Sequence, residues 1–141
     1  MPIETIGTNH FAVSVADLEA SIRWYEDVLG FRLVARNTID KLGVPVAHLD
    51  APDSGFVLEL FAPTNAKPTP DERRFPDTDM MTNGNKHFSL SIADSAKTMK
   101  KLGEMGIEIV MTADVWNTFG IFIRDPSGNV IELMEGDMRG N

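Results

Sequence analysis

Residues 9–17 read NHFAVSVAD, and residues 86–94 read KHFSLSIAD. Each stretch has a histidine in second place, His10 and His87, followed by apolar residues that alternate with smaller ones. Such alternation is typical of a β-strand with one buried face. Because an internal repeat governs the whole fold, this similarity indicates that the two halves of the chain share one architecture.

The repeat extends well beyond these nine letters. Two further pairs of segments correspond: VLGFRLV (28–34) with EMGIEIV (104–110), and FVLELF (56–61) with NVIELM (129–134). The last pair aligns Glu59 with Glu132. Since there are only two copies, the pattern predicts a tandem duplication and excludes a solenoid.

Each copy predicts a βαβββ module. In the first copy the strand is followed by Asp17, a residue that often caps helices, and by a helical pattern that ends at Gly30. Asp94 and Gly106 occupy the same places in the second copy. The later strands are expected at about 31–36, 44–50 and 56–61, and at about 107–111, 119–124 and 129–134. The fold class predicted is α+β, with two tandem βαβββ modules.

The length of 141 residues suits one domain. We expect the first module at about 7–63 and the second at about 86–136. Between them, residues 64–85 are rich in proline and show no periodicity, as expected of a linker, a lid or both.

Composition excludes several classes of protein. The net charge of −8 disfavours nucleic acid as a partner, and the absence of cysteine excludes disulfides and thiolate metal sites. The chain has no run of 18 apolar residues, which argues against a membrane span. Its first ten residues lack the pattern of a secretory signal. These features permit a cytoplasmic location, which is our expectation.

Side chains alternate between the two faces of a strand. In the first strand Phe11, Val13 and Val15 share the face that the helix should cover, so His10 faces away from it. The same reasoning places the other histidine and both glutamates on the face away from their helices. If the modules form one curved mixed sheet with helices outside, its concave face receives four such side chains: His10, Glu59, His87 and Glu132.

A metal ion would offset the unfavourable free energy of placing these four side chains together. Unpaired carboxylates on one buried face repel each other, and a divalent cation removes that repulsion. Neutral imidazole with carboxylate suits Zn, Ni, Co, Mn or Fe(II) better than calcium. A lone histidine at a strand start is usually a surface or core residue, but here the candidates recur in pairs. We therefore predict a cleft centred on one divalent metal ion.

The chain resembles the vicinal oxygen chelate superfamily, which includes glyoxalase I, methylmalonyl-CoA epimerase, extradiol dioxygenases and the fosfomycin and bleomycin resistance proteins. The resemblance covers nearly the whole chain and rests on four segments: NHFAVSVADLEASIRWYEDVLGF, LELFAP, KHFSLSIAD and DPSGNVIELME. It implies paired βαβββ modules with a metal at the centre of a cleft. The family's four ligand positions fall on His10, Glu59, His87 and Glu132.

The ligand set is most similar to that of glyoxalase I of the bacterial type, because position 59 is a glutamate. The resemblance implies a metal-dependent isomerase or lyase that removes a proton next to a metal-bound carbonyl or hydroxyl, with Glu132 and Glu59 as candidate bases. The alternatives are an epimerase like methylmalonyl-CoA epimerase, which generally has glutamine at that site, an extradiol-type dioxygenase, and a metal-free binding protein like those of bleomycin resistance. A small-molecule substrate and a homodimer are also implied.

Contacts to the substrate are less clearly indicated. Glyoxalase I typically has an arginine four residues after the first histidine, where this chain has Ser14, so a cation for glutathione would have to come from elsewhere. The candidate cations are Arg73, Arg74 and Lys86. The other candidate contacts are His48, Trp116 and Phe119. His48 is either an acid or base of the cleft or a structural residue. Trp116 and Phe119 form either an apolar wall or part of the core.

Overall fold

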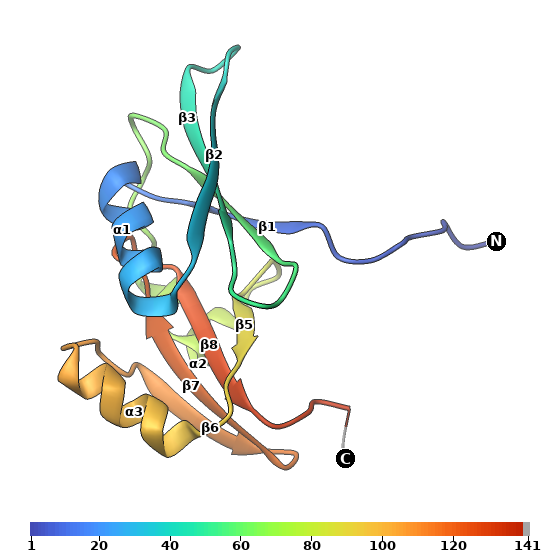
Figure 1. Cartoon of the computed structure of the whole chain (residues 1–141), viewed down its shortest axis with the longest axis vertical. Helices are drawn as coiled ribbons and strands as arrows, with labels where there is room; N and C mark the ends of the chain where they lie inside the picture. The colour runs from blue at the N-terminus through green and yellow to red at the C-terminus, as the bar shows by residue number, and fades with distance from the viewer. Residues whose placement is uncertain (140–141) are drawn as a thin grey trace. The chain divides into compact units, whose positions relative to one another are not determined.

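The structure, a computed structural model, describes residues 1–139. The chain divides into two compact units, Met1–Lys67 and a second one that begins at Pro68. Each unit contains one βαβββ module, so the predicted α+β class and the two tandem modules are confirmed (Figure 1). The strands form two separate four-stranded sheets, one in each unit.

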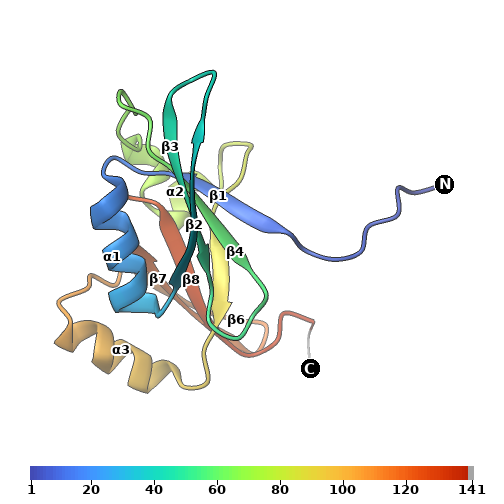
Figure 2. The same cartoon turned by 45° about the horizontal axis from the view of Figure 1, so that its top comes forward.

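The first unit has one helix on a mixed sheet. Its elements are β1 (His10–Ser14), α1 (Leu18–Leu29), β2 (Arg32–Ile39), β3 (Val44–Asp50) and β4 (Val57–Phe61). The strand order is β1-β4-β3-β2, in which β1 and β4 run parallel and the other neighbours run antiparallel. Figure 2 shows β1 beside β4, although β1 is the first strand in the chain and β4 the last strand of the module.

Helix α1 begins and ends where the sequence predicts. The side chain of Asp17 accepts a hydrogen bond of 3.0 Å from the amide of Ala20, which satisfies a donor that the first helical turn leaves free. Gly30 adopts a left-handed conformation with φ 70° and its amide donates to Glu26 O. Ile22 and Tyr25 are buried against the sheet. The caps thus set the length of the helix, and its apolar face sets its position.

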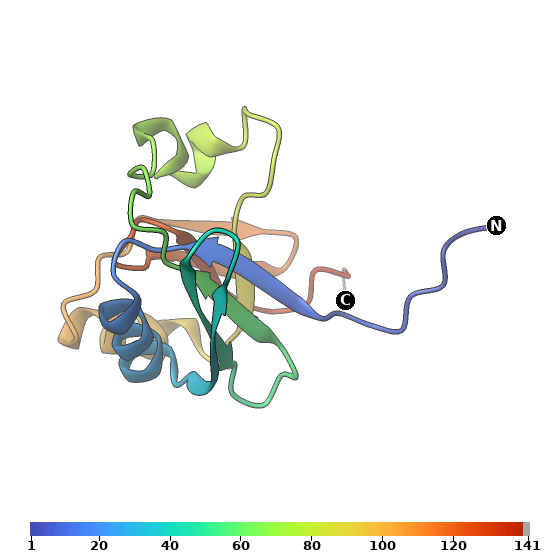
Figure 3. The same ribbon diagram turned by 90° about the horizontal axis from the view of Figure 1, so that it is seen from above.

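The second unit repeats this arrangement. Its elements are η1 (Asp71–Arg73), α2 (Pro76–Asp79), β5 (Phe88–Ser91), α3 (Ser95–Glu104), β6 (Met111–Val115), β7 (Thr118–Arg124) and β8 (Val130–Glu135). The strand order β5-β8-β7-β6, with β5 and β8 parallel, matches that of the first unit. Within this unit, Figure 3 shows α3 on one side of the sheet and the η1–α2 segment on the other.

The faces of the strands follow the predicted alternation. Leu58 and Leu60 of β4 are buried, as are Ile131 and Leu133 of β8. In each sheet the glutamate, Glu59 or Glu132, therefore projects from the face opposite to these buried side chains. Burial of the leucine and isoleucine side chains fixes the register, because a shift by one residue would exchange the two faces.

Two segments differ from the sequence expectation. Strand β6 begins at Met111 rather than at 107, because the amide of Ile107 bonds back to Leu102 O at the end of α3. The bonding to β7 starts at Val110, whose amide donates to Phe122 O. Residues 64–85 contain the short helices η1 and α2 instead of an irregular segment. None of the helices within residues 1–139 has the length and apolar character needed to cross a membrane.

Candidate metal site

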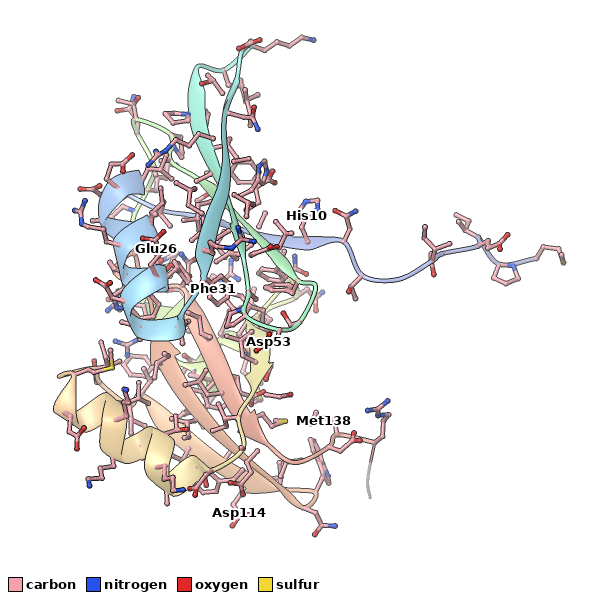
Figure 4. The ribbon with its side chains drawn as sticks, in the orientation of Figure 1. His10, Glu26, Phe31, Asp53, Asp114 and Met138 are labelled. Atoms are coloured by element: carbon pink, nitrogen blue, oxygen red, sulfur yellow. The ribbon has the colours of Figure 1, made fainter. Side chains whose placement is uncertain are left out.

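The first unit brings His10 and Glu59 together. Ala12 of β1 lies opposite Glu59 of β4, so His10 is the diagonal neighbour of the glutamate on the same face. Nε2 of His10 is 3.6 Å from Oε1 of Glu59. Figure 4 labels His10 at the start of β1. The parallel pairing of the first and last strands of the module therefore creates the pair.

The ring of His10 lies between two polar partners. Its Nδ1 is 2.6 Å from Oδ1 of Asn9, and an amide oxygen only accepts hydrogen bonds, so Nδ1 donates this bond. Its Nε2 lies 3.6 Å from Oε1 of Glu59, beyond hydrogen-bond distance. A metal ion could bind this nitrogen when it carries no proton.

The second oxygen of Glu59 has a different partner. His48 of β3 lies directly opposite Glu59, and its Nε2 donates a hydrogen bond of 2.7 Å to Oε2. From the sequence, His48 is either an acid or base of the cleft or a structural residue; in the structure its ring is hydrogen-bonded to the candidate ligand Glu59. The hydrogen bond fixes the orientation of the Glu59 carboxylate.

The second unit contains the equivalent pair. Ser89 of β5 lies opposite Glu132 of β8, so His87 occupies the same diagonal position as His10. Nε2 of His87 is 3.9 Å from Oε1 of Glu132. The Glu132 side chain is only 10% exposed. A carboxylate with so little access to water needs a counter-charge or hydrogen-bond donors.

Two residues that sequence reasoning missed complete the surroundings of Glu132. Phe122 of β7 lies opposite Glu132, in the place that His48 has in the first module, and its ring meets the His87 ring edge-on at 5.2 Å. Gly120 also faces the glutamate, because a Cβ atom there would lie 2.8 Å from Oε2. Once the register of β7 is known, the two-residue strand period identifies both positions.

The two pairs come close to the spacing of metal ligands. Ligand atoms about 2.1 Å from one ion lie roughly 3–3.5 Å from each other, and the separations here are slightly longer, 3.6 and 3.9 Å. Within residues 1–139, neither unit assembles three histidine, aspartate or glutamate side chains into a metal-binding group. Each unit therefore brings together one histidine and one glutamate, and the binding of a metal ion by these four side chains stays a prediction.

Arg73 and Lys86 already have a protein partner. Nε of Arg73 lies 3.1 Å and Nζ of Lys86 lies 3.0 Å from Oδ1 of the buried Asp79. Burial raises the pKa of the Asp79 carboxyl, but the hydrogen bonds from Lys86 and Arg73 outweigh it, so the pKa is lowered. Both cations connect α2 to the segment that leads into β5. A role for either in substrate binding stays a prediction.

The other candidate substrate contacts are dispersed within the second unit. Trp116 is 72% exposed at the tip of the β6–β7 hairpin, where Trp116 and Asn117 both have positive φ, as a two-residue type I′ turn requires. Phe119 shares a face of β7 with Ile121, opposite to Glu132. The aromatic ring beside the His87–Glu132 pair is that of Phe122. Arg74 borders a separate cavity, described below.

Known proteins show similarity along most of the chain. The Salmonella typhimurium virulence protein STM3117 is 28% identical over 132 residues, which cover 90% of this chain and 82% of that protein. Among solved structures, a glyoxalase family protein from Enterococcus faecalis superposes with a TM-score of 0.74 at 22% identity, covering 92% of this chain and 97% of that one. Lactoylglutathione lyase from Agrobacterium tumefaciens has a TM-score of 0.67 at 21% identity, with both chains fully covered.

These structural likenesses support the same fold. The family model of the Glyoxalase/Bleomycin resistance protein/Dioxygenase superfamily matches residues 7–133, which span both modules and both His–Glu pairs. The resemblance noted in the sequence is therefore confirmed over most of the chain. The protein belongs to the Glyoxalase/Bleomycin resistance protein/Dioxygenase superfamily.

Proposed function

We propose that the protein is a metal-dependent isomerase or lyase of the glyoxalase I type, acting on a small oxygenated substrate. One observation carries the proposal: the same diagonal His–Glu pair occurs in both modules, on the sheet face away from the helix. His10, Glu59, His87 and Glu132 would hold the ion. The donor set suits Ni, Zn, Co, Mn or Fe.

A divalent ion bound there would polarise a substrate oxygen and make a neighbouring C–H group more acidic. The chain itself would move the proton. Glu132 is the first candidate base, because its carboxylate is nearly buried beside Phe122 and has no hydrogen-bond donor among residues 1–139. Glu59 is the second candidate, with one oxygen held by His48.

Metal content tests the ligand assignment. Purified wild-type protein should retain about one divalent ion per chain, as the four-ligand set requires. The variants His10→Ala and His87→Ala should each lose most of it. Arg32→Ala is the matched control, because among residues 1–139 the Arg32 side chain makes only an exposed ion pair with Asp50. Metal retention in both histidine variants at the wild-type level would overturn the assignment.

Proton exchange tests the chemistry. The hemithioacetal of methylglyoxal and glutathione is the first substrate to try, since lactoylglutathione lyase from Agrobacterium tumefaciens shares the fold. In D₂O, the metal-loaded protein should convert it to a thioester that carries deuterium at the carbon next to the carbonyl. Because Ser14 stands where an arginine is expected, hydroxy-ketones without glutathione form a second panel. If no compound in either panel shows metal-dependent exchange, the proposed chemistry is wrong.

The hydrogen bond between His48 and Glu59 favours a second candidate function. With Glu59 occupied by His48, the remaining ligands would be His10, His87 and Glu132, the two-histidine, one-carboxylate set of Fe(II) dioxygenases. Glu59→Ala separates the two candidates, because it should abolish metal binding in the four-ligand site and spare it in the three-ligand site. The dioxygenase alternative also predicts oxygen uptake with a catechol.

We also propose that the protein works as a homodimer in the cytoplasm. Members of the superfamily often form dimers, and the absence of cysteine suits a reducing compartment. Light scattering of the full chain at micromolar concentration should give twice the monomer mass of 15.6 kDa. A mass equal to that of the monomer excludes the dimer.

A further inference from the structure

We propose that the second unit binds a phosphate-type oxyanion, free or carried on a small molecule, between Arg74 and Arg124. Both arginines line a cavity of about 250 Å³, together with residues of the α3–β6 connection and the β7–β8 turn. The inference does not depend on the proposed enzymatic function. The cavity shares none of its residues with the His87–Glu132 pair.

Arg74 supplies a guanidinium group without a protein partner. Within residues 1–139, its side chain makes no hydrogen bond or ion pair, although the residue is half-buried. Its Nη1 lies against the backbone of Gly128, where a Cβ atom would come within 2.9 Å. A partly desolvated cation gains more from an anion than a fully hydrated one does.

Arg124 is fixed in place and keeps donors free. Its side chain is 12% exposed, its Nε donates to Arg74 O at 2.9 Å, and its guanidinium stacks on the Phe75 ring at 4.8 Å. The only carboxylate paired with it among the described residues is that of Glu108, 3.4 Å away and 72% exposed. Because the Glu108 carboxylate is largely in water, the pair is weak at that distance. A better-placed anion could therefore displace Glu108.

The other acidic group in the cavity wall, Asp125, already accepts hydrogen bonds from its own turn. Oδ1 of Asp125 accepts from the amides of Ser127 and Asn129, both at 2.9 Å, and its Oδ2 accepts from Asn129 Nδ2 at 2.8 Å. The C-terminus of α3 also uses carbonyls internally, since Ile107 N donates to Leu102 O. The unused polar groups of the cavity are thus mainly guanidinium N–H donors.

These donors match a phosphate group better than a single carboxylate. Each guanidinium offers a planar fork of N–H groups that binds two oxygens at once, and two such forks suit a tetrahedral dianion. The chain as a whole carries a charge of −8 and repels anions. Binding at this place would therefore rest on local contacts rather than on the overall field.

NMR titration of the full ¹⁵N-labelled chain with inorganic phosphate tests the proposal. The amide signals of Gly106, Glu108 and Gly128 should shift and saturate. Arg74→Gln should weaken the affinity by about tenfold to a hundredfold, the loss expected for a charged hydrogen-bonded contact. Arg32→Gln, a charge-matched change in the first unit, should leave it unchanged. No saturable shift, or equal affinity in Arg74→Gln, would overturn the site.

A second variant changes the affinity in the opposite direction. Glu108→Gln removes the competing carboxylate from Arg124, so phosphate should bind more tightly by a few fold. The side chain is exposed, so this change should leave the fold intact and remains informative if Arg74→Gln does not fold. A parallel titration with sodium chloride at equal ionic strength distinguishes phosphate binding from general screening of surface charges. If chloride reproduces the shifts, or if Glu108→Gln weakens phosphate binding, the proposal is wrong.

Discussion

Nε2 of His48 donates a 2.7 Å hydrogen bond to Oε2 of Glu59, whereas the corresponding position opposite Glu132 is held by Phe122. The duplication has therefore produced two pairs that match in backbone register and differ in their surroundings. One glutamate is oriented by a hydrogen bond, and the other lies next to an apolar ring. The two carboxylates should respond differently to substitution.

Removal of His48 should weaken metal binding without removing a metal ligand. His48→Ala leaves the Glu59 carboxylate without its hydrogen bond, so the affinity for the metal should fall by about 10- to 100-fold. Competition with a chelator measures this affinity, and His48→Gln should recover part of it through its side-chain amide. Arg32→Ala again serves as the control. An unchanged affinity in His48→Ala would show that Glu59 does not bind the ion.

Glu132→Gln should keep the fold and lower the catalytic turnover. The two side chains are nearly isosteric, so the melting temperature should change little. Turnover should fall by about 10²- to 10⁴-fold, as for the loss of a positioned general base. Bound metal and deuterium exchange measured on the same samples distinguish a lost base from a lost ligand. If turnover stays near the wild-type level with metal bound, Glu59 becomes the candidate base.

Gly120→Ala should disturb the site through a single methyl group. The added Cβ would lie 2.8 Å from Oε2 of Glu132 and force the carboxylate to move. We expect lower metal affinity and lower turnover, with the fold kept, because a non-glycine residue can adopt the backbone conformation there. Gly103→Ala in α3 is the matched control. Apart from the backbone of its own helix and its chain neighbours, no atom of the described residues would lie within 4 Å of the added Cβ. Helix propensity predicts a gain of up to about 1 kcal/mol. Equal effects of the two changes on metal binding would contradict this explanation.

Asp79 should make part of the stability depend on acid pH. Its pKa is lowered in the folded chain by hydrogen bonds from Lys86 and Arg73, which outweigh burial. Its contribution is therefore complete above the ordinary pKa of 3.8 and is lost as the pH falls through the lower folded value. Asp79→Asn should lower stability by about 1–3 kcal/mol at pH 6, and the difference from wild type should shrink below pH 3.8.

Thermal unfolding from pH 6 to pH 2 measures this dependence. Asp137 provides the control, since Arg139 lowers its pKa as well but the pair is exposed at the surface. Asp137→Asn should leave the melting temperature unchanged, because an exposed ion pair adds little. A constant gap between wild type and Asp79→Asn down to pH 2 would mean that the carboxylate charge is not what stabilises this segment.

The sequence predicts those features that depend on local pattern. The helix limits at Asp17, Gly30 and Asp94 follow from capping chemistry, and the orientation of Glu59 and Glu132 follows from strand alternation. Their exact neighbours depend on the register between strands, which no local pattern gives. The His48 contact and the nearby Phe122 could therefore not be assigned. The helices η1 and α2 escaped prediction because their anchor is a tertiary ion pair at Asp79.

The parallel pairing of β1 with β4, and of β5 with β8, has a consequence for how the protein folds. In each module the histidine lies at or beside the first strand and the glutamate lies on the last strand. The two side chains meet only when these strands pair, and of all strand pairings in the module this one joins the residues farthest apart in sequence. Closing so long a loop is entropically costly, and topologies dominated by such contacts fold slowly. The β2–β3 and β6–β7 hairpins can form early, whereas each His–Glu pair should be among the last features that a newly made chain acquires.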